Sequence, residues 1–291
     1  MGFEWSRTDA TMGDGFLRIA CEQVGKAING VADIGQSPSK RIHEARRRCK
    51  KLRGLLRLVR PGFPEYDDEN GLIRDAARHL SEARDAKVVR QTLAELMAWA
   101  GRPEPEFPDE TVDERRELEV LARFGEQLEA LQQRVDAWPV KHIDPRTIER
   151  GLARSYRAAR RAMRHTEDAP SDLVFHEWRK HAKYHWHHLG LLEQSAPDIL
   201  ESETRAAGAL ADLLGLHHDL AVLRGLIAED AGKLGVAIDV SFVADAATRR
   251  QVDLEGQIGA LGRQVFAETP NALRARFAAY LKTWKMHAAA A

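Results

Sequence analysis

The segment His43-Glu-Ala-Arg46-Arg-Arg-Cys-Lys50-Lys-Leu-Arg53-Gly-Leu-Leu-Arg57-Leu decides the fold class of this protein. At about 100° per residue, a helix through this region has one apolar stripe, made of Ala45, Cys49, Leu52, Leu56 and Val59. A basic stripe runs beside it and contains His43, Arg46, Lys50, Arg53, Arg57 and Arg60. Residues 39–60 hold ten Lys or Arg and one acid, Glu44. The pattern predicts an amphipathic helix whose core-facing side is flanked by positive charge.

Helical periodicity continues along nearly the whole chain, with no alternating strand pattern and no Asn-Gly hairpin signal. Breakers such as Ser37-Pro38 and Asp144-Pro145 separate the helical segments. They predict helices at 14–33, 39–60, 67–99, 109–137, 145–167, 172–194, 198–230 and 239–267, with a ninth at 271–287. Asp144 is expected to cap the helix that Pro145 begins. The predicted fold class is all-α.

An internal repeat relates the two halves of the chain. His43-Glu-Ala-Arg46 and Lys50 recur as His176-Glu-Trp-Arg179 and Lys183, with the same spacing from each histidine. Downstream, Arg84-Asp85 parallels His218-Asp219 at nearly the same offset. We therefore predict two related four-helix halves, residues 1–138 and 139–291, with the C-terminal helix added to the second half.

The chain has 291 residues, with 44 basic and 44 acidic side chains and a formal charge of zero. This balance argues against a basic nucleic-acid-binding arm or an acidic disordered tail, but it allows locally charged surfaces. Cys21 and Cys49 are too few for a disulfide framework and are expected to be reduced core thiols. No segment approaches the roughly 20 apolar residues of a membrane span, and the N-terminus does not resemble a signal peptide. A cytoplasmic protein is expected.

The segment 145–167 has the most regular charge pattern. Its arginines recur every three or four residues within an arc of about 80°. They are Arg146, Arg150, Arg154, Arg157, Arg161 and Arg164, here called the arginine ladder. Each like-charged neighbour pair costs an isolated helix about 0.2–0.5 kcal/mol, and Glu149 alone cannot compensate, so something else should neutralise this face. The segment 172–194 adds a basic arc of His176, Arg179, Lys180, Lys183 and His187.

Two sources of negative charge are open. Residues 104–119 contain eight acids against two arginines, so a neighbouring helix can supply it through ion pairs. The other source is an external polyanion whose phosphate oxygens accept hydrogen bonds from guanidinium and ammonium groups. The charge pattern alone does not decide between them.

These motifs resemble the conserved histidine α-helical domain (CHAD) family. The resemblance rests on the two histidine motifs, on the Arg84-Asp85 step and on the segment from Leu213 to Leu223, and it covers nearly the whole chain. It implies two antiparallel four-helix bundles related by a pseudo-twofold axis, with a basic central groove or pore that binds inorganic polyphosphate. It also implies association with polyphosphate granules. The binding residues predicted from the stripes and this resemblance are His43, Arg46, Lys50, Arg53, Arg57, Arg150, Arg154, Arg157, Arg161, Arg164, His176, Arg179, Lys180 and Lys183.

Polyphosphate suits the charge pattern because it carries about one negative charge per phosphate and presents no bases to read. The basic stripes contain few aromatic residues, unlike a channel for single-stranded nucleic acid. Neither a specific nucleic acid nor a membrane is therefore an expected partner. The second repeat departs from the first where Trp186 stands in the position of Arg53, so weaker phosphate binding is expected there.

Other chemistry has little support in the sequence. His181, His185 and His188 share a helix face, but no familiar zinc-binding spacing is present, so no metal is predicted. No phosphate-binding loop or nucleophile elbow occurs, so neither catalytic residues nor a cofactor are predicted. The first hypothesis is non-catalytic polyphosphate binding. The alternatives are a structural or interaction protein, whose stripes pair with acidic helices or a protein partner, and a phosphohydrolase that acts on polyphosphate.

Overall fold

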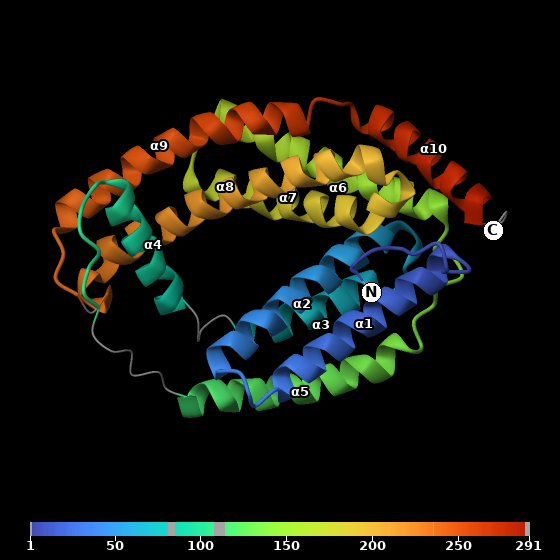
Figure 1. Ribbon diagram of the computed structural model, residues 1–291, viewed down its shortest axis with the longest axis horizontal. Helices are drawn as coiled ribbons and strands as arrows, with labels where there is room; N and C mark the ends of the chain where they lie inside the picture. The colour runs from blue at the N-terminus through green and yellow to red at the C-terminus, as the bar shows by residue number, and fades with distance from the viewer. Residues whose placement is uncertain (1, 81–84, 108–113, 235, 289–291) are drawn as a thin grey trace.

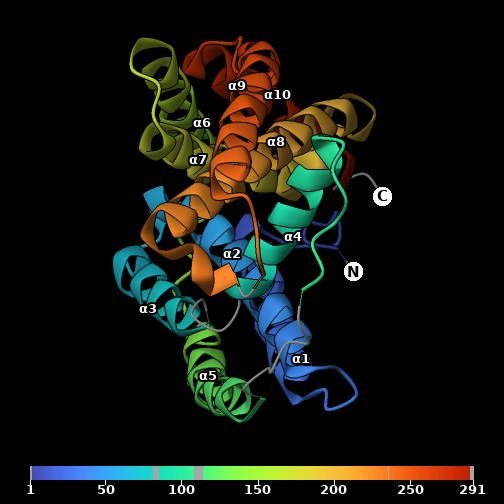
Figure 2. The ribbon, with the colours of Figure 1, turned by 90° about the vertical axis from the view of Figure 1, so that its left-hand side faces the viewer.

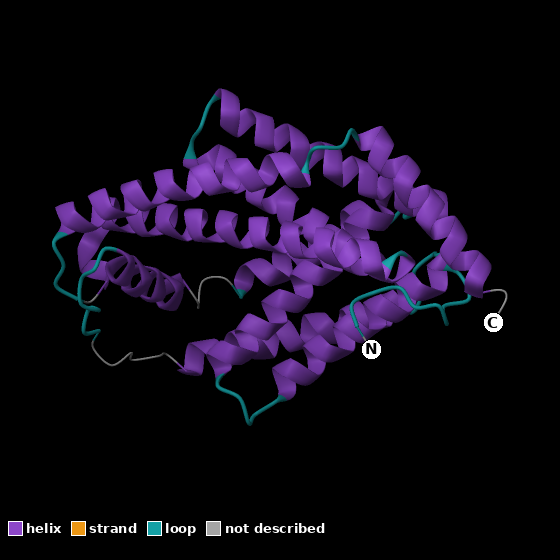
Figure 3. Ribbon diagram, turned by 45° about the horizontal axis from the view of Figure 1, so that its top comes forward, coloured by secondary structure: helices purple, strands orange, loops and turns teal. Residues whose placement is uncertain are grey.

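The helices begin at the prolines and capping residues that interrupt the apolar patterns. The computed structural model describes residues 2–80, 85–107, 114–234 and 236–288, and within them the regular structure is all helical (Figure 3). The α-helices are α1 (Met12–Ala32), α2 (Pro38–Val59), α3 (Tyr66–His79), α4 (Asp85–Trp99), α5 (Glu114–Val135), α6 (Pro145–Asp168), α7 (Asp172–Leu192), α8 (Pro197–Asp230), α9 (Val240–Val265) and α10 (Pro270–Ala288). Short 3-10 helices are η1 (Arg60–Gly62), η2 (Glu193–Ser195) and η3 (Ala231–Leu234). The all-α prediction is confirmed.

Asp144 and Pro145 start α6 in the way the sequence predicts. The Asp144 Oδ1 atom accepts a hydrogen bond from the Thr147 amide at 2.7 Å, and Pro145 occupies the first turn. The Thr147 hydroxyl in turn donates to the carbonyl of His142 at 2.8 Å. These contacts fix the beginning of the helix that carries the arginine ladder.

Two groups of helices face each other across the molecule (Figure 1). The first consists of α1, α2, α3 and α5, and the second consists of α6, α7, α8, α9 and α10. The groups meet where α2 packs against α6 and α7. Since α2 and α7 carry the two histidine motifs, this contact brings the repeated basic segments to the centre of the structure.

The predicted single helix over 67–99 is wrong. Helix α3 ends at His79, and the next helix, α4, begins at Asp85 and packs against α8 and α9 of the second group (Figures 1 and 2). A straight helix of that length would extend for about 50 Å, whereas α3 packs against α2 and α5 and α4 packs in the other group. The break lets the apolar side chains Val89, Leu93 and Leu96 of α4 be buried. Helix α4 thus follows α3 in sequence but lies with the second group in space.

The core is continuous and rich in aromatic rings. Phe16, Phe63 and Trp138 pack together in the first group, with ring centroids 5.2 to 5.5 Å apart. Both cysteines are free thiols, and Cys49 is buried as expected. Cys21 is only half-buried, and its Sγ atom donates to Asp136 at 3.6 Å. Cys21 packs against the core but lies at its border, so it is less buried than expected.

Helix α8 is more apolar than the sequence analysis expects of any segment. Among the described residues, Pro197–Leu234 is the one helical stretch whose length and mean hydropathy, 1.2 over an 18-residue window, would allow it to cross a membrane. However, 39% of that window is buried, and α8 packs against α4, α7 and α9. Length and composition are a weak indication of a membrane span here, because a helix that packs in a protein core can meet the same criterion.

Candidate functional site

The basic stripe of α2 lies beside a fully buried apolar stripe. Ala45, Cys49 and Leu52 are at most 2% exposed, and Leu56 and Val59 are also buried. On the adjoining face His43 and Lys50 are exposed, while Arg46, Arg53 and Arg57 are half-buried. The stripe is therefore at the border between core and surface, where a cation keeps its head in water while its stem packs on apolar neighbours.

Two arginines of this stripe are oriented by neighbouring helices. The Arg53 Nε atom donates to Asn70 Oδ1 of α3 at 3.1 Å. The Arg57 guanidinium lies over the ring of Tyr184 of α7, 4.1 Å from its centroid. Such a contact holds the cation through the negative face of the ring without neutralising its charge. Both guanidinium groups are thus positioned without an acidic partner within the described residues.

Helices α2 and α7 cross at Gly54. The His188 Nε2 atom donates to the carbonyl of Gly54 at 2.9 Å, and the space above Gly54 is bordered by His187. Gly54 and His187 occupy equal offsets from His43 and His176, the histidines of the two repeated motifs. The crossing therefore joins equivalent positions of the two histidine motifs.

A cavity of about 530 Å³ opens beside this crossing. It is lined by Phe3, His43, Arg47, Lys50, Lys51, Lys183, Trp186, His187, Gly190, Thr204 and Asp212. Three predicted binding residues thus share one cavity: His43 and Lys50 on α2, and Lys183 on α7. Arg47 also lines it, although its position on the helix is off the basic stripe. This cavity is here called the α2–α7 cavity.

All six members of the arginine ladder are exposed on α6. The opposite face of the helix is buried through Leu152, Tyr156, Ala159 and Met163. Within the described residues no ladder arginine makes a salt bridge. Glu149 pairs instead with Arg274 of α10, at 3.6 Å. The ladder therefore presents a positive surface without a neutralising partner among those residues.

The basic arc of α7 is held by local contacts. The Nδ1 atoms of His176 and His218 lie 3.2 Å apart, which joins α7 to α8, and Lys180 pairs with Glu177 at 2.6 Å. Burial lowers the pKa of His176, and the charges of Lys180 and Arg179 lower it further. Loss of hydration and repulsion by cations both disfavour the imidazolium. His176 is thus a neutral hydrogen-bonding residue near neutral pH.

His181 of α7 is affected by charges on α2 and α6. Burial lowers its pKa, and the charges of Arg57 on α2 and Arg161 on α6 act in the same direction. Cations affect an imidazole in this way only over short distances. Helix α7 packs against both α2 and α6, which places His181 near the basic stripe of α2 and the arginine ladder of α6.

Comparison with known proteins identifies the family. A family model described as CHAD domain matches residues 17–228. The chain belongs to the CHAD family. Binding of inorganic polyphosphate is a general property of that family. A comparison with curated proteins finds no match.

A solved CHAD structure shares the fold. The crystal structure of the CHAD domain from the plant Ricinus communis aligns with a TM-score of 0.64 and 18% sequence identity. The alignment covers 91% of this chain and 95% of that chain. The all-helical architecture is thus common to the two proteins despite their low identity.

In this CHAD domain the histidine cluster of α7 is part of the core. His185 and His188 are completely buried, and His185 packs against Tyr156 and Phe266 with centroid distances of 5.1 and 5.5 Å. Burial lowers the pKa of both histidines to about 3. Among the residues that the structure describes, no group of three or more His, Cys, Asp or Glu is arranged to hold a metal ion.

Part of the acidic segment and one repeat anchor lie outside the described residues. Residues 108–113 and Arg84 are not described, nor is the side chain of Asp85. In the described part of the acidic segment, Glu104 and Glu106 are exposed, and Glu119 pairs with Arg115 at 3.3 Å. This pair joins residues one turn apart on α5 and does not reach the arginine ladder.

Several residues that line the α2–α7 cavity are not among those predicted from the sequence. Phe3 comes from the N-terminal segment, and Thr204 and Asp212 come from α8. No sequence signal links these positions to α2, because they meet only in three dimensions. Trp186 is different, since its departure from the repeat marks it in the sequence.

Proposed function

We propose that this protein binds inorganic polyphosphate, without catalysing a reaction on it, through the basic faces of α2, α6 and α7. The observation that carries the proposal is the exposed arginine ladder of α6, which makes no salt bridge within the described residues. Membership of a family that binds polyphosphate supports the same ligand.

Electrostatics explains why a polyanion is the expected ligand. Successive ladder arginines repel one another by about 0.2–0.5 kcal/mol per pair, and Glu149 is paired with Arg274. A flexible chain with one charge per phosphate can follow a line of guanidinium groups and form charge-assisted hydrogen bonds at each. Since the chain has no net charge, attraction is concentrated at these faces.

A titration with long-chain polyphosphate at two salt concentrations tests the proposal. Counterion release makes the affinity fall steeply as salt rises, with a log–log slope of about −0.7 per phosphate contact for a flexible chain. Absence of salt-sensitive binding would favour the alternative, a structural protein whose stripes pair with acidic helices or a partner.

The absence of catalysis and the cellular location belong to the same proposal. Incubation with polyphosphate and Mg²⁺ should release no phosphate above the rate of a buffer control. Release that depends on the protein would favour the phosphohydrolase alternative. We also propose that the protein is cytoplasmic and associates with polyphosphate granules. A fluorescent fusion should form foci that disappear in cells unable to make polyphosphate.

A further inference from the structure

One wall of the α2–α7 cavity is aromatic. It contains Phe3, Trp186 and His187. The rings of Trp186 and His187 are stacked with centroids 4.9 Å apart, and Phe3 meets His187 edge to face at 6.0 Å. Burial and nearby lysines lower the pKa of His187 to about 3, so this ring is neutral and contributes as an aromatic surface.

The cavity also has a cationic lining. Arg47, Lys50 and Lys51 of α2 and Lys183 of α7 line it, and the Lys51 ammonium lies 4.9 Å from the centroid of Phe3. Burial lowers the pKa of Lys51, and the charges of Arg48 and Arg47 lower it further. Cations crowded around one cavity favour an anionic ligand.

Polar groups from α8 complete the lining. The hydroxyl oxygen of Thr204 is buried and has no hydrogen-bond partner within the described residues, and Asp212 also lines the cavity. A buried hydroxyl without a partner costs free energy and is usually satisfied by a ligand or water. A ligand with hydroxyl or amino groups would satisfy these two residues.

Polyphosphate does not account for the aromatic wall. Trp186 stands at the position that Arg53 occupies in the first histidine motif, so the second motif has an aromatic ring where the first has a cation. Gly208 of α8 makes room for the indole, because a side chain there would lie 3.1 Å from Trp186 Nε1. Inorganic phosphate chains have no apolar surface to stack on such a ring, whereas a nucleobase does.

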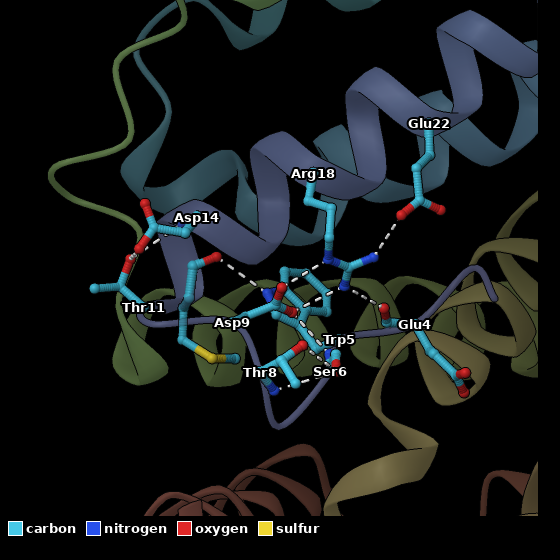
Figure 4. Close-up of polar contacts among 10 residues, drawn as sticks. Glu4, Trp5, Ser6, Thr8, Asp9, Thr11, Asp14, Arg18 and Glu22 are labelled. Carbon is cyan, nitrogen blue, oxygen red and sulfur yellow. Dashed lines mark hydrogen bonds and ion pairs between the residues drawn. The ribbon is translucent and has the colours of Figure 1, made fainter. Parts of the chain in front are cut away.

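The N-terminal segment is anchored so that Phe3 stays at the cavity. Arg18 of α1 donates to Asp9 Oδ1 at 2.6 Å and to the carbonyl of Glu4 at 2.9 Å (Figure 4). Trp5 is buried, and its amide donates to the carbonyl of Leu191 at 3.1 Å. Phe3 is therefore held against α7 by contacts on both sides of the segment.

We infer that the α2–α7 cavity binds a nucleotide, with its base against Trp186 and Phe3 and its phosphates on Lys50, Lys51 and Lys183. A volume of about 530 Å³ is within the usual range for sites that bind small molecules. Thr204 and Asp212 then face the ribose or the polar edge of the base. Lys50 and Lys183 are also predicted polyphosphate-binding residues, so the two ligands compete. Nucleotide binding does not require that the proposed function be correct.

Calorimetric titration with ATP and with inorganic tripolyphosphate, without divalent cations, separates base recognition from charge. Tripolyphosphate is at least as negatively charged as ATP. If charge alone determined binding, tripolyphosphate would bind as tightly as ATP or more tightly. Stacking should instead make ATP bind about ten-fold tighter or more. Equal affinities, or tighter binding of tripolyphosphate, would overturn the inference.

Substitution of Trp186 by alanine tests the ring directly. We expect ATP affinity to fall by about ten-fold or more while tripolyphosphate affinity stays within about two-fold. Trp99→Ala is the matched control, because Trp99 is on α4, is 42% exposed and does not line this cavity. A Trp186→Ala protein that binds ATP normally, or loses both ligands equally, contradicts the inference.

Phe3→Ala provides a second variant if the first does not fold, because Phe3 precedes the first helix and lines the same wall. The expected result is again a selective loss of ATP affinity, and an equal loss of both ligands contradicts it. The outcomes also separate this inference from the proposed function. If long-chain polyphosphate does not bind, the proposed function fails, but tighter binding of ATP than of tripolyphosphate still supports the nucleotide site. If ATP binds no tighter than tripolyphosphate, the nucleotide site fails, but binding of long-chain polyphosphate still supports the proposed function.

Discussion

Glu149 is paired with Arg274 in a contact between α6 and α10. Glu149 is the one acidic residue between Arg146 and Arg164, the first and last residues of the arginine ladder. The carboxylate is 12% exposed, and its Oε2 atom lies 3.6 Å from the Arg274 Nε atom. On the isolated helix, Glu149 would lie one turn from Arg146. In the folded protein it pairs with α10, and no ladder arginine has an acidic partner among the described residues.

Charge reversal in the ladder should weaken polyphosphate binding. We expect Arg157→Glu/Arg161→Glu to lower the affinity for long-chain polyphosphate by at least about ten-fold. Each lost phosphate contact also removes about 0.7 from the salt slope, so its magnitude should fall by about 1.5. Fluorescence anisotropy with labelled polyphosphate at several salt concentrations measures both quantities.

A charge-reversal variant outside the basic faces shows whether polyphosphate affinity depends on the position of the arginines or on the net charge of the protein. Arg123 of α5 and Arg249 of α9 are exposed arginines on helices outside the basic faces. Arg123→Glu/Arg249→Glu changes the total charge by the same amount and should leave the affinity within about three-fold, since only near charges act strongly at physiological salt. Equal losses in the two double variants would mean that the ladder has no special role. Arg47 is unsuitable as a control, because it lines the α2–α7 cavity.

Neutralising the ladder should stabilise the ligand-free protein. Arg157→Gln/Arg161→Gln removes three repulsive neighbour pairs, which predicts a gain of about 0.6–1.5 kcal/mol in the free energy of unfolding. The same variant should bind polyphosphate less tightly. Urea denaturation at low salt measures the gain. A less stable double variant would indicate that these arginines have structural partners.

Gly151 should not tolerate a side chain. A Cβ atom at this position would overlap the carbonyl oxygen of Leu58, where α6 crosses α2. Gly151→Ala should therefore lower the free energy of unfolding by about 3 kcal/mol or more, since backbone must move to relieve the overlap. Gly256→Ala is the control, because nothing lies within 4 Å of a Cβ there and alanine favours an exposed helix by about 0.5–1 kcal/mol. Thermal unfolding followed by circular dichroism distinguishes the two.

The buried histidines make stability depend on pH. Burial lowers the pKa of His185 and His188 to about 3, whereas an unfolded histidine titrates near its ordinary value of 6.5. Between these values the unfolded chain binds more protons, so stability is complete above the unfolded pKa and is lost as the pH falls towards 3. Each histidine contributes a slope of up to about 1.4 kcal/mol per pH unit. Urea denaturation between about pH 7 and pH 4.5 measures the total slope.

His185→Leu isolates one of these contributions. Both ring nitrogens of His185 are buried without a hydrogen-bond partner in the described part of the chain, so a similar apolar side chain loses no contact of that kind. The slope of stability against pH should decrease by up to about 1.4 kcal/mol per unit. An unchanged slope would show that His185 does not titrate on unfolding.

The N-terminal segment should detach when its anchor is removed. Asp9 is 6% exposed in its side chain and accepts hydrogen bonds from Arg18 and from the Ser6 amide. Asp9→Asn removes the charge that Arg18 faces, and we expect a loss of about 1–3 kcal/mol and faster hydrogen exchange in residues before α1. Asp67→Asn is the control, since its exposed pair with Arg60 should contribute less than about 1 kcal/mol. Unchanged exchange in the Asp9 variant would contradict the anchoring role.

Local patterns predicted the helices well, because their signals are short-range. The Asp144 cap, the buried stripe of α2 and the exposure of the arginine ladder all follow from residues within a few turns of one another. The break between α3 and α4 did not follow in the same way. Residues 67–99 have helical periodicity throughout, and the chain turns after His79 because α4 is buried against α8 and α9, far away in sequence.

The sequence by itself determined the all-helical class, the family and the positive faces of α2, α6 and α7, since helical spacing alone brings like charges onto one side. Tertiary structure decided which charges have no acidic partner among the described residues. It also decided that Phe3, Trp186 and Thr204 meet in one cavity with Lys50 and Lys183. The reason is physical: a helix face is set by neighbours three or four residues away, whereas a cavity forms only where distant segments bury their apolar surfaces together.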